Sequence, residues 1–316
     1  MKKQLLILVI LICGISAIRL NAQSDSYYSL FEYAQGIYNP GSAGSNNAMC
    51  VTSLHRQQWT GLKEGRPKVT VFSFDMPMIG MDNLGVGLNI NQDIIGFQQD
   101  INVGANVAFR TELDPGMLGI GLGINVINRS INGDWITWES LNGQTVYIDP
   151  SIPHMESKTA FDLSFGATLV GENFWVGLSA THLTKPKINY DIEAPSYIAR
   201  HYYLTGGYDY SLPNPSFDLI GSGFIISDGG MPTATLNLKL LYNKSFWGGV
   251  SLRYSDAIVP MVGIHLLNGI SIGYSYDIVL SKIGSYQYGS HEIMIRYCFN
   301  VSGGKTAGRY RSVRRL

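Results

Sequence analysis

The sequence predicts an all-β fold: a transmembrane antiparallel β-barrel of about 14 strands with short periplasmic turns and longer extracellular loops. Three observations support this prediction. Apolar and small polar residues alternate along the chain, which is the period of a β-strand. Charged residues make up 15% of the chain, below the roughly 25% typical of soluble domains. After residue 22, no apolar run approaches the roughly 20 residues that a spanning helix needs.

The first 22 residues have the pattern of a secretory signal peptide. Lys2 and Lys3 form the charged start, an apolar run follows over 5–12, and small residues lead to Ala22. Removal of this segment takes away three basic residues and no acid, so the mature chain carries a net charge of about −3. Neither the full sequence nor the mature chain has the excess of basic residues that is typical of nucleic-acid-binding proteins, so we expect no nucleic-acid partner.

The alternation is clearest over residues 84–91, where Leu, Val, Leu and Ile share one face while Gly and Asn share the other. The same pattern returns over 118–126 and 270–278. A soluble all-β domain, the alternative, would carry Lys, Glu and Thr on its outer face. Small uncharged residues are more typical of a crowded barrel interior behind a lipid-facing apolar surface.

The lengths of the connections indicate the orientation. Tight turns follow the even-numbered predicted strands, whereas the longest connections, 129–158, 183–198 and 279–289, follow odd-numbered ones. We therefore expect both termini on the periplasmic side. The predicted strands cover 47–59, 67–76, 84–92, 100–110, 117–128, 159–170, 173–182, 199–210, 216–227, 232–243, 246–255, 259–268, 269–278 and 290–299.

Tyrosines gather near the predicted strand ends, as in the aromatic girdles of membrane barrels. The alternative is that tyrosine is simply common in strands. The residues concerned are Tyr202, Tyr203, Tyr208, Tyr210, Tyr242, Tyr254, Tyr274, Tyr276, Tyr286, Tyr288 and Tyr297.

Four stretches follow one another in an order that spans nearly the whole mature chain: 38–44 (YNPGSAG); 56–61 (RQQWTG) with Pro67 and 73–77 (SFDMP); 273–277 (GYSYD); and 289–293 (GSHEI). Together they resemble the PorP/SprF family, outer-membrane proteins of the Bacteroidetes type IX secretion and gliding system. The resemblance implies a non-enzymatic barrel that supports export and cell-surface attachment of a partner protein with a type B C-terminal sorting domain. It also implies outer-membrane lipid and periplasmic type IX components as partners.

A second function stays open, that of a passive outer-membrane transporter of hydrophobic solutes with an N-terminal plug. Catalysis is not expected, because the six histidines are scattered and neither a His-Glu-x-x-His nor a Gly-x-Ser-x-Gly motif occurs. We expect no cofactor and no metal site.

The chain divides into four parts: a signal peptide (1–22), an irregular N-terminal segment (23–46), the barrel (47–300) and a basic C-terminal tail (301–316). The segment 23–46 is a plug in the lumen or lies beneath the barrel, and its Asn39 and Pro40 are candidate partner-binding or lumen residues. The alternative is a turn that launches the first strand. The tail is placed in the periplasm, where it holds a periplasmic partner or the peptidoglycan layer, or is a solvated, disordered end.

Strand parity directs seven charged side chains into the lumen, where they are less costly than on the lipid face. They form either a paired network that closes the lumen or a charged path for a peptide. The residues are Arg56, Arg110, Lys239, Arg253, Asp277, Glu292 and Arg296.

Three tryptophans are candidate partner contacts. Trp59 ends the first predicted strand near the outer rim, while Trp135 and Trp138 lie in the long connection 129–158. Aromatic residues on a loop favour recognition. The alternative for that connection is a lid over the barrel mouth.

Cys50 and Cys298 fall on the first and last strands, which become neighbours when the barrel closes. An exported protein can form a disulfide here. Two small buried thiols are the favoured interpretation, because a disulfide needs Cα atoms within about 7 Å of each other and the sequence does not show that distance.

Overall fold

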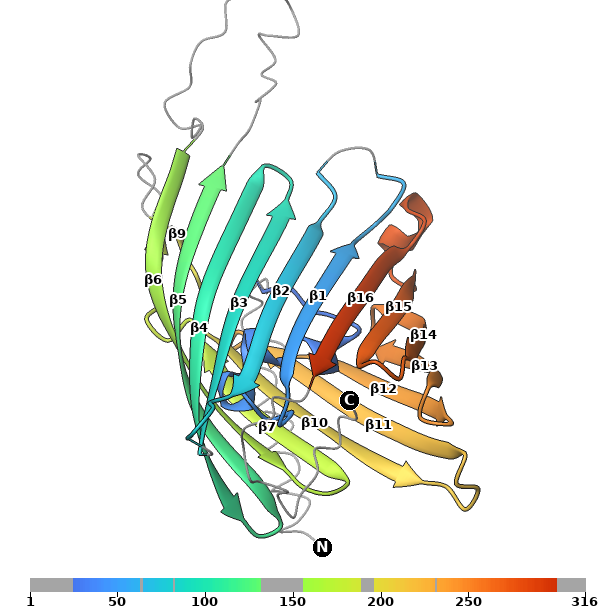
Figure 1. Cartoon of the computed structure of the whole chain (residues 1–316). Coiled ribbons are helices and arrows are strands. Elements are labelled where there is room, and N and C mark those ends of the chain that lie inside the picture. The colour runs from blue at the N-terminus through green and yellow to red at the C-terminus, as the bar shows by residue number, and fades with distance from the viewer. Residues whose placement is uncertain are drawn as a thin grey trace, which may run out of the picture.

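The computed structural model describes residues 25–62, 65–81, 83–131, 156–188, 196–230 and 232–299. These residues form a closed antiparallel barrel of fourteen strands, which confirms the predicted fold class (Figure 1). The barrel strands are β1 (Met49–Gln57), β2 (Lys68–Pro77), β3 (Leu84–Ile95), β4 (Gln98–Leu113), β5 (Gly116–Ile131), β6 (Glu156–Val170), β7 (Phe174–Thr181), β10 (His201–Ser211), β11 (Phe217–Ser227), β12 (Thr233–Tyr242), β13 (Phe246–Arg253), β14 (Ala257–His265), β15 (Ile270–Val279) and β16 (Ser290–Phe299).

Each strand pairs with its sequence neighbour around the barrel, and β7 pairs directly with β10. Two short strands, β8 (Lys187–Ile188) and β9 (Ser196–Tyr197), pair with each other within the connection between β7 and β10. The 3₁₀ helix η3 (Lys282–Tyr286) lies in the connection between β15 and β16.

The barrel has two different rims. We call the one with the connections 78–83, 114–115, 171–173, 212–216, 243–245 and 266–269 the short-turn rim, and the opposite one the long-loop rim. The connection between β3 and β4 is an exception, because only residues 96–97 join these strands at the long-loop rim. Gly96 has a φ of 60°, which suits such a tight turn, and both strands extend beyond their predicted ends to meet there.

The barrel closes between β1 and β16, and the register places Cys50 directly opposite Cys298. Their Cα atoms lie 4.1 Å apart and a disulfide joins them. The two free thiols favoured from the sequence are therefore wrong. The reason is that the register of β1 against β16 decides whether the two cysteines face each other. The spacing of the cysteines in the sequence does not show this register.

The outer surface of the wall is apolar, as a lipid-facing surface requires. Leu122, Phe161 and Leu236 are among its most exposed side chains, at 64%, 73% and 62%. Tyr203 does not belong to this surface: it is only 5% exposed and faces the lumen. Its neighbour Tyr202 takes the outward position, because successive side chains of a strand point to opposite faces.

Candidate functional site: the occupied lumen

Residues 25–48, which we call the luminal segment, lie inside the barrel (Figure 1). The segment contains η1 (Phe31–Tyr33), α2 (Gln35–Tyr38) and η2 (Pro40–Ser42). Phe31 and Tyr38 are almost completely buried, and both rings pack against Phe224 of β11 at centroid distances of 5.1 and 5.2 Å. The segment therefore contributes a hydrophobic core inside the barrel, where an open channel would hold water.

One side of the luminal segment lies against glycines of the wall. A Cβ added to Gly121 would lie 2.4 Å from the carbonyl carbon and oxygen of Pro40, and one on Gly119 would lie 2.4 Å from the Gly41 oxygen. The Asn39 side chain donates hydrogen bonds to the carbonyl oxygen of Ala167 and to Thr168 Oγ1, at 3.1 and 2.9 Å. Asn39 and Pro40 thus lie in the lumen against β5 and β6, and the alternative of a turn that launches the first strand is wrong.

The other side of the luminal segment contacts buried charges. Arg56 forms ion pairs with Asp277 at 2.6 Å and with Glu292 at 2.9 Å. Arg253 pairs with the same Asp277 at 2.8 Å. All four side chains are at most 1% exposed. Charges buried this deeply need close partners of opposite sign, and within this network they have them.

The luminal segment completes this charge network. The backbone N–H groups of Ser29 and Leu30 donate to the two oxygens of Glu292 at 3.0 and 2.7 Å. The Ser29 hydroxyl accepts a hydrogen bond from Arg253 at 2.9 Å, and the Arg253 guanidinium lies 4.2 Å from the ring centroid of Tyr27. The network is therefore shared between the wall and the segment.

Three further cations hold the luminal segment nearer the short-turn rim. Lys239 forms an ion pair with Glu32 of η1. Arg296 lies 5.9 Å from the ring centroid of Tyr33 and donates to the sulfur atoms of the disulfide, at 3.0 Å to Cys298 and 3.2 Å to Cys50. Arg110 donates to the side-chain oxygen of Asn47 at 2.6 Å. All seven charged residues expected inside are buried there, with exposures of 7% or less.

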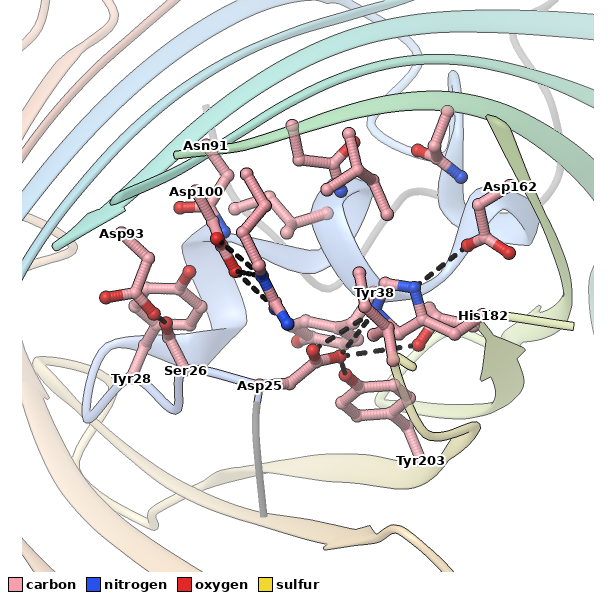
Figure 2. A pocket seen from close by; sticks show the side chains of 17 residues that line it. Asp25, Ser26, Tyr28, Tyr38, Asn91, Asp93, Asp100, Asp162, His182 and Tyr203 are labelled. Atoms are coloured by element: carbon pink, nitrogen blue, oxygen red, sulfur yellow. Dashed lines mark hydrogen bonds and ion pairs between the residues drawn. The ribbon is translucent and has the colours of Figure 1, made fainter. Parts of the chain in front are cut away.

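A polar cavity of about 60 Å³ lies beside the start of the luminal segment (Figure 2). Figure 2 shows Asp25 facing His182, which follows β7, and Tyr203 of β10. His182 Nε2 lies 3.1 Å from Asp25 Oδ1, and its Nδ1 lies 2.9 Å from Asp162 Oδ2. Burial lowers the pKa of the His182 imidazole, but the charges of these carboxylates and their hydrogen bonds outweigh burial and raise its pKa to about 10.

The sequence gives no signal for this cluster. Asp25, His182 and Tyr203 are far apart along the chain and belong to no motif, and Tyr203 is expected in the aromatic girdle. Only the closure of the barrel around the luminal segment brings them together.

The sequence matches the family described as type IX secretion system membrane protein PorP/SprF over residues 20–297. The chain belongs to the PorP/SprF family. It is thus a β-barrel of the outer membrane that belongs to a family of secretion-system proteins. Among the described residues, no helix is long and apolar enough to cross a membrane. No curated protein matches the chain.

Several solved barrels are similar in fold at low identity. Omp33 of Acinetobacter baumannii is 8% identical, with 80% of this chain and 100% of that chain covered and a TM-score of 0.44. A Pseudomonas aeruginosa FadL homologue is 11% identical, with coverages of 80% and 89% and a TM-score of 0.47. The KdgM porin is 12% identical, with coverages of 79% and 99% and a TM-score of 0.37.

Two of the PorP/SprF-like stretches, 56–61 and 289–293, meet at the long-loop rim. Trp59 lies after β1, and its N–H donates to Ser290 Oγ of β16 at 3.1 Å. Trp135 and Trp138 lie outside the described residues, as do the predicted signal peptide and the basic tail.

Proposed function

We propose that this barrel supports the export and cell-surface attachment of a partner protein with a type B C-terminal sorting domain, without catalysing a reaction. PorP/SprF membership supports the secretion role. The single observation that favours an attachment role is the luminal segment, which occupies the space through which a solute would pass. In this proposal both termini are periplasmic and the long-loop rim faces outward.

The luminal segment is bonded to the wall at separate places around the barrel. Its Ser29 N–H donates to Glu292 of β16, and its Gly36 carbonyl accepts from Asn89 of β3 at 2.8 Å and from Asn106 of β4 at 2.6 Å. Among the described residues, two cavities beside the segment measure about 60 and 70 Å³, room for a few water molecules at 10–15 Å³ each. A solute of ordinary size would have to displace the segment, which argues against the transporter alternative.

The partner surface is proposed at the long-loop rim, around Trp59 and the connection that carries Trp135 and Trp138. The test is purification of the barrel from native membranes, with the W135A/W138A double variant beside it. Leu267→Ala is the matched control, because Leu267 is fully exposed at the short-turn rim. We expect a stoichiometric protein with a type B C-terminal domain to accompany the wild type and the control, and at least five-fold less of it with the double variant.

Two results would contradict the proposal. One is that no such protein accompanies the wild type above the level seen with an unrelated outer-membrane barrel. The other is that deletion of the gene leaves the captured protein at the cell surface, measured by protease shaving. Planar-bilayer conductance and liposome swelling test the alternative, since steady solute flux through the isolated wild-type barrel would favour transport.

A further inference from the structure

Three side chains that proteins use to bind metals meet at the beginning of the luminal segment. They are Asp25, the first described residue of that segment; His182, directly after β7; and His201, the first residue of β10. The side chains of His182 and His201 are 8% and 0% exposed, and that of Asp25 is 22% exposed. The cluster is thus shielded from water except on the side of the carboxylate.

The donor atoms have the spacing of a metal site. Asp25 Oδ1 lies 3.1 Å from His182 Nε2, and Asp25 Oδ2 lies 3.5 Å from His201 Nδ1. All three donor atoms lie within 4.8 Å of one another. In a tetrahedral zinc site with bonds of 2.0–2.1 Å, the donors are about 3.3 Å apart. Two of the separations already match, and a small movement of the imidazoles would complete the set.

The surroundings orient the ligands as a metal site requires. Asp162 Oδ2 lies 2.9 Å from His182 Nδ1, so the proton on Nδ1 stays on the side of Asp162, and a metal ion at Nε2 displaces the proton that faces Asp25. In metal sites, a ligating histidine commonly donates its other ring N–H to a carboxylate, which fixes the orientation of the ring. Tyr203 donates to Asp25 Oδ2 at 2.5 Å and fixes the carboxylate in turn.

The buried His201 is only partly accounted for by hydrogen bonds. Its Nδ1 lies 3.1 Å from the Ala199 carbonyl oxygen, and its Nε2 has no hydrogen-bond partner among the described residues. Binding of an ion at Nδ1 therefore requires this nitrogen to give up its proton and the contact with Ala199, with the remaining proton of the neutral ring on Nε2. The adjoining cavity of about 60 Å³ has room for a water molecule as a further ligand.

We propose that Asp25, His182 and His201 bind one divalent transition-metal ion of the zinc class. Two imidazoles and one carboxylate suit Zn²⁺ better than Ca²⁺ or Mg²⁺, which prefer oxygen ligands throughout. The ion ties the start of the luminal segment to both ends of the connection between β7 and β10. The inference does not depend on the identity of any exported partner.

The test measures Zn²⁺ binding by the full mature barrel in detergent, with any affinity tag removed and the protein first treated with a chelator. Equilibrium dialysis gives the stoichiometry and affinity, and the visible spectrum of Co²⁺ reports tetrahedral coordination. We expect one Zn²⁺ per chain and at least a 100-fold loss of affinity in H182Q and in H201Q. Asp162→Asn, which perturbs the support of His182, should lose about 10- to 100-fold.

His55→Gln is the matched control, because His55 is exposed on the outer face of β1 and bonds to Thr70 at 3.0 Å. It should bind Zn²⁺ as the wild type does. Migration on unheated gels verifies that each variant is a folded barrel, and glutamine keeps the size and polarity of histidine for that purpose. The proposal is overturned if the wild type does not bind at micromolar Zn²⁺, or if the H182Q/H201Q double variant binds as tightly as the wild type.

Discussion

The two sides of the lumen hold the same luminal segment by different means. On the side of β3–β6, glycines let the backbone of the wall approach the backbone of Pro40 and Gly41, with the Cβ position of Gly121 only 2.4 Å from Pro40. On the side of β13, β15, β16 and β1, the ion network around Arg56 and Asp277 binds the segment at Ser29. The first side works by shape and the second by charge.

The difference shows two kinds of dependence between the wall and the segment: the glycine wall leaves space for the segment, whereas the charged wall receives hydrogen bonds from it. The glycine wall provides space that only a closely fitting backbone fills. The charged wall contains ionised groups to which the segment supplies further hydrogen bonds, as the two N–H donors to Glu292 show. Burial of such charges requires close partners of opposite sign and additional hydrogen bonds. Four changes test this comparison, from the largest expected effect to the smallest.

Replacement of Arg56 by Met should have the largest effect. It leaves Asp277 and Glu292 each without one of their cations in a buried site, and breaking a buried ion pair in this way costs about 3–5 kcal/mol. The free energy of unfolding, measured with urea in detergent or lipid, should fall by that amount. Lys68→Met, at an exposed position of the neighbouring β2, should change it by less than about 0.5 kcal/mol. Wild-type stability of R56M would show that the charged side is dispensable.

Replacement of Gly121 by Ala should be next. The added methyl group meets the backbone of Pro40, and overpacking typically costs about 1–3 kcal/mol. We expect a lower unfolding midpoint together with increased ion conductance, since the segment must move. Gly221→Ala is the control, because a Cβ there has nothing within 4 Å. If G121A and G221A had the same unfolding midpoint and the same conductance, close packing of the segment against Gly121 would not be what holds it.

The double variant R56M/G121A tests whether the segment docks as one unit. If it does, R56M already loosens the segment that G121A displaces. The free energy of unfolding of the double variant should then fall by less than the sum of the two single-variant losses. We expect a coupling of about 0.5 kcal/mol or more in a double-mutant cycle. The pair R56M/G221A should be additive. Additivity in both cycles would mean that the two sides hold the segment independently.

Replacement of Asn106 by Ala should have the smallest effect. It removes the 2.6 Å hydrogen bond to the Gly36 carbonyl, which keeps its second bond from Asn89. A neutral hydrogen bond contributes about 0.5–1.5 kcal/mol, and the urea midpoint should shift accordingly. A loss as large as that of R56M would mean that hydrogen bonds matter on the glycine side as much as shape does.

Much of the wall could be predicted from the sequence. The fourteen predicted strands all occur, because alternation and turn chemistry are local properties and strands joined by short turns pair with their neighbours. The side-chain direction of Arg253 or Glu292 also follows from alternation, since a charge on the lipid face is costly. The residues predicted for β3 and β4 stop short of the two-residue turn at Gly96, because polar residues such as Asp93 and Gln98 lie on both sides of it and are typical of a longer loop.

The contents of the lumen could not be predicted in the same way. Whether residues 25–48 enter the barrel depends on contacts between residues such as Asn39 and Thr168, which are 129 positions apart. The disulfide depends on the register of β1 against β16, and the cluster around His182 depends on which residues the closed wall turns toward Asp25. None of these distances follows from a local pattern.

The sequence by itself therefore determined the wall of this protein: the strand period, the turns, the apolar outer face, the inward charges and the secretion family. The tertiary structure decided what the wall encloses. The physical reason is that a strand's period and pairing are set by residues close together in the chain, whereas the fit of the luminal segment requires a closed barrel whose opposite sides meet it at once.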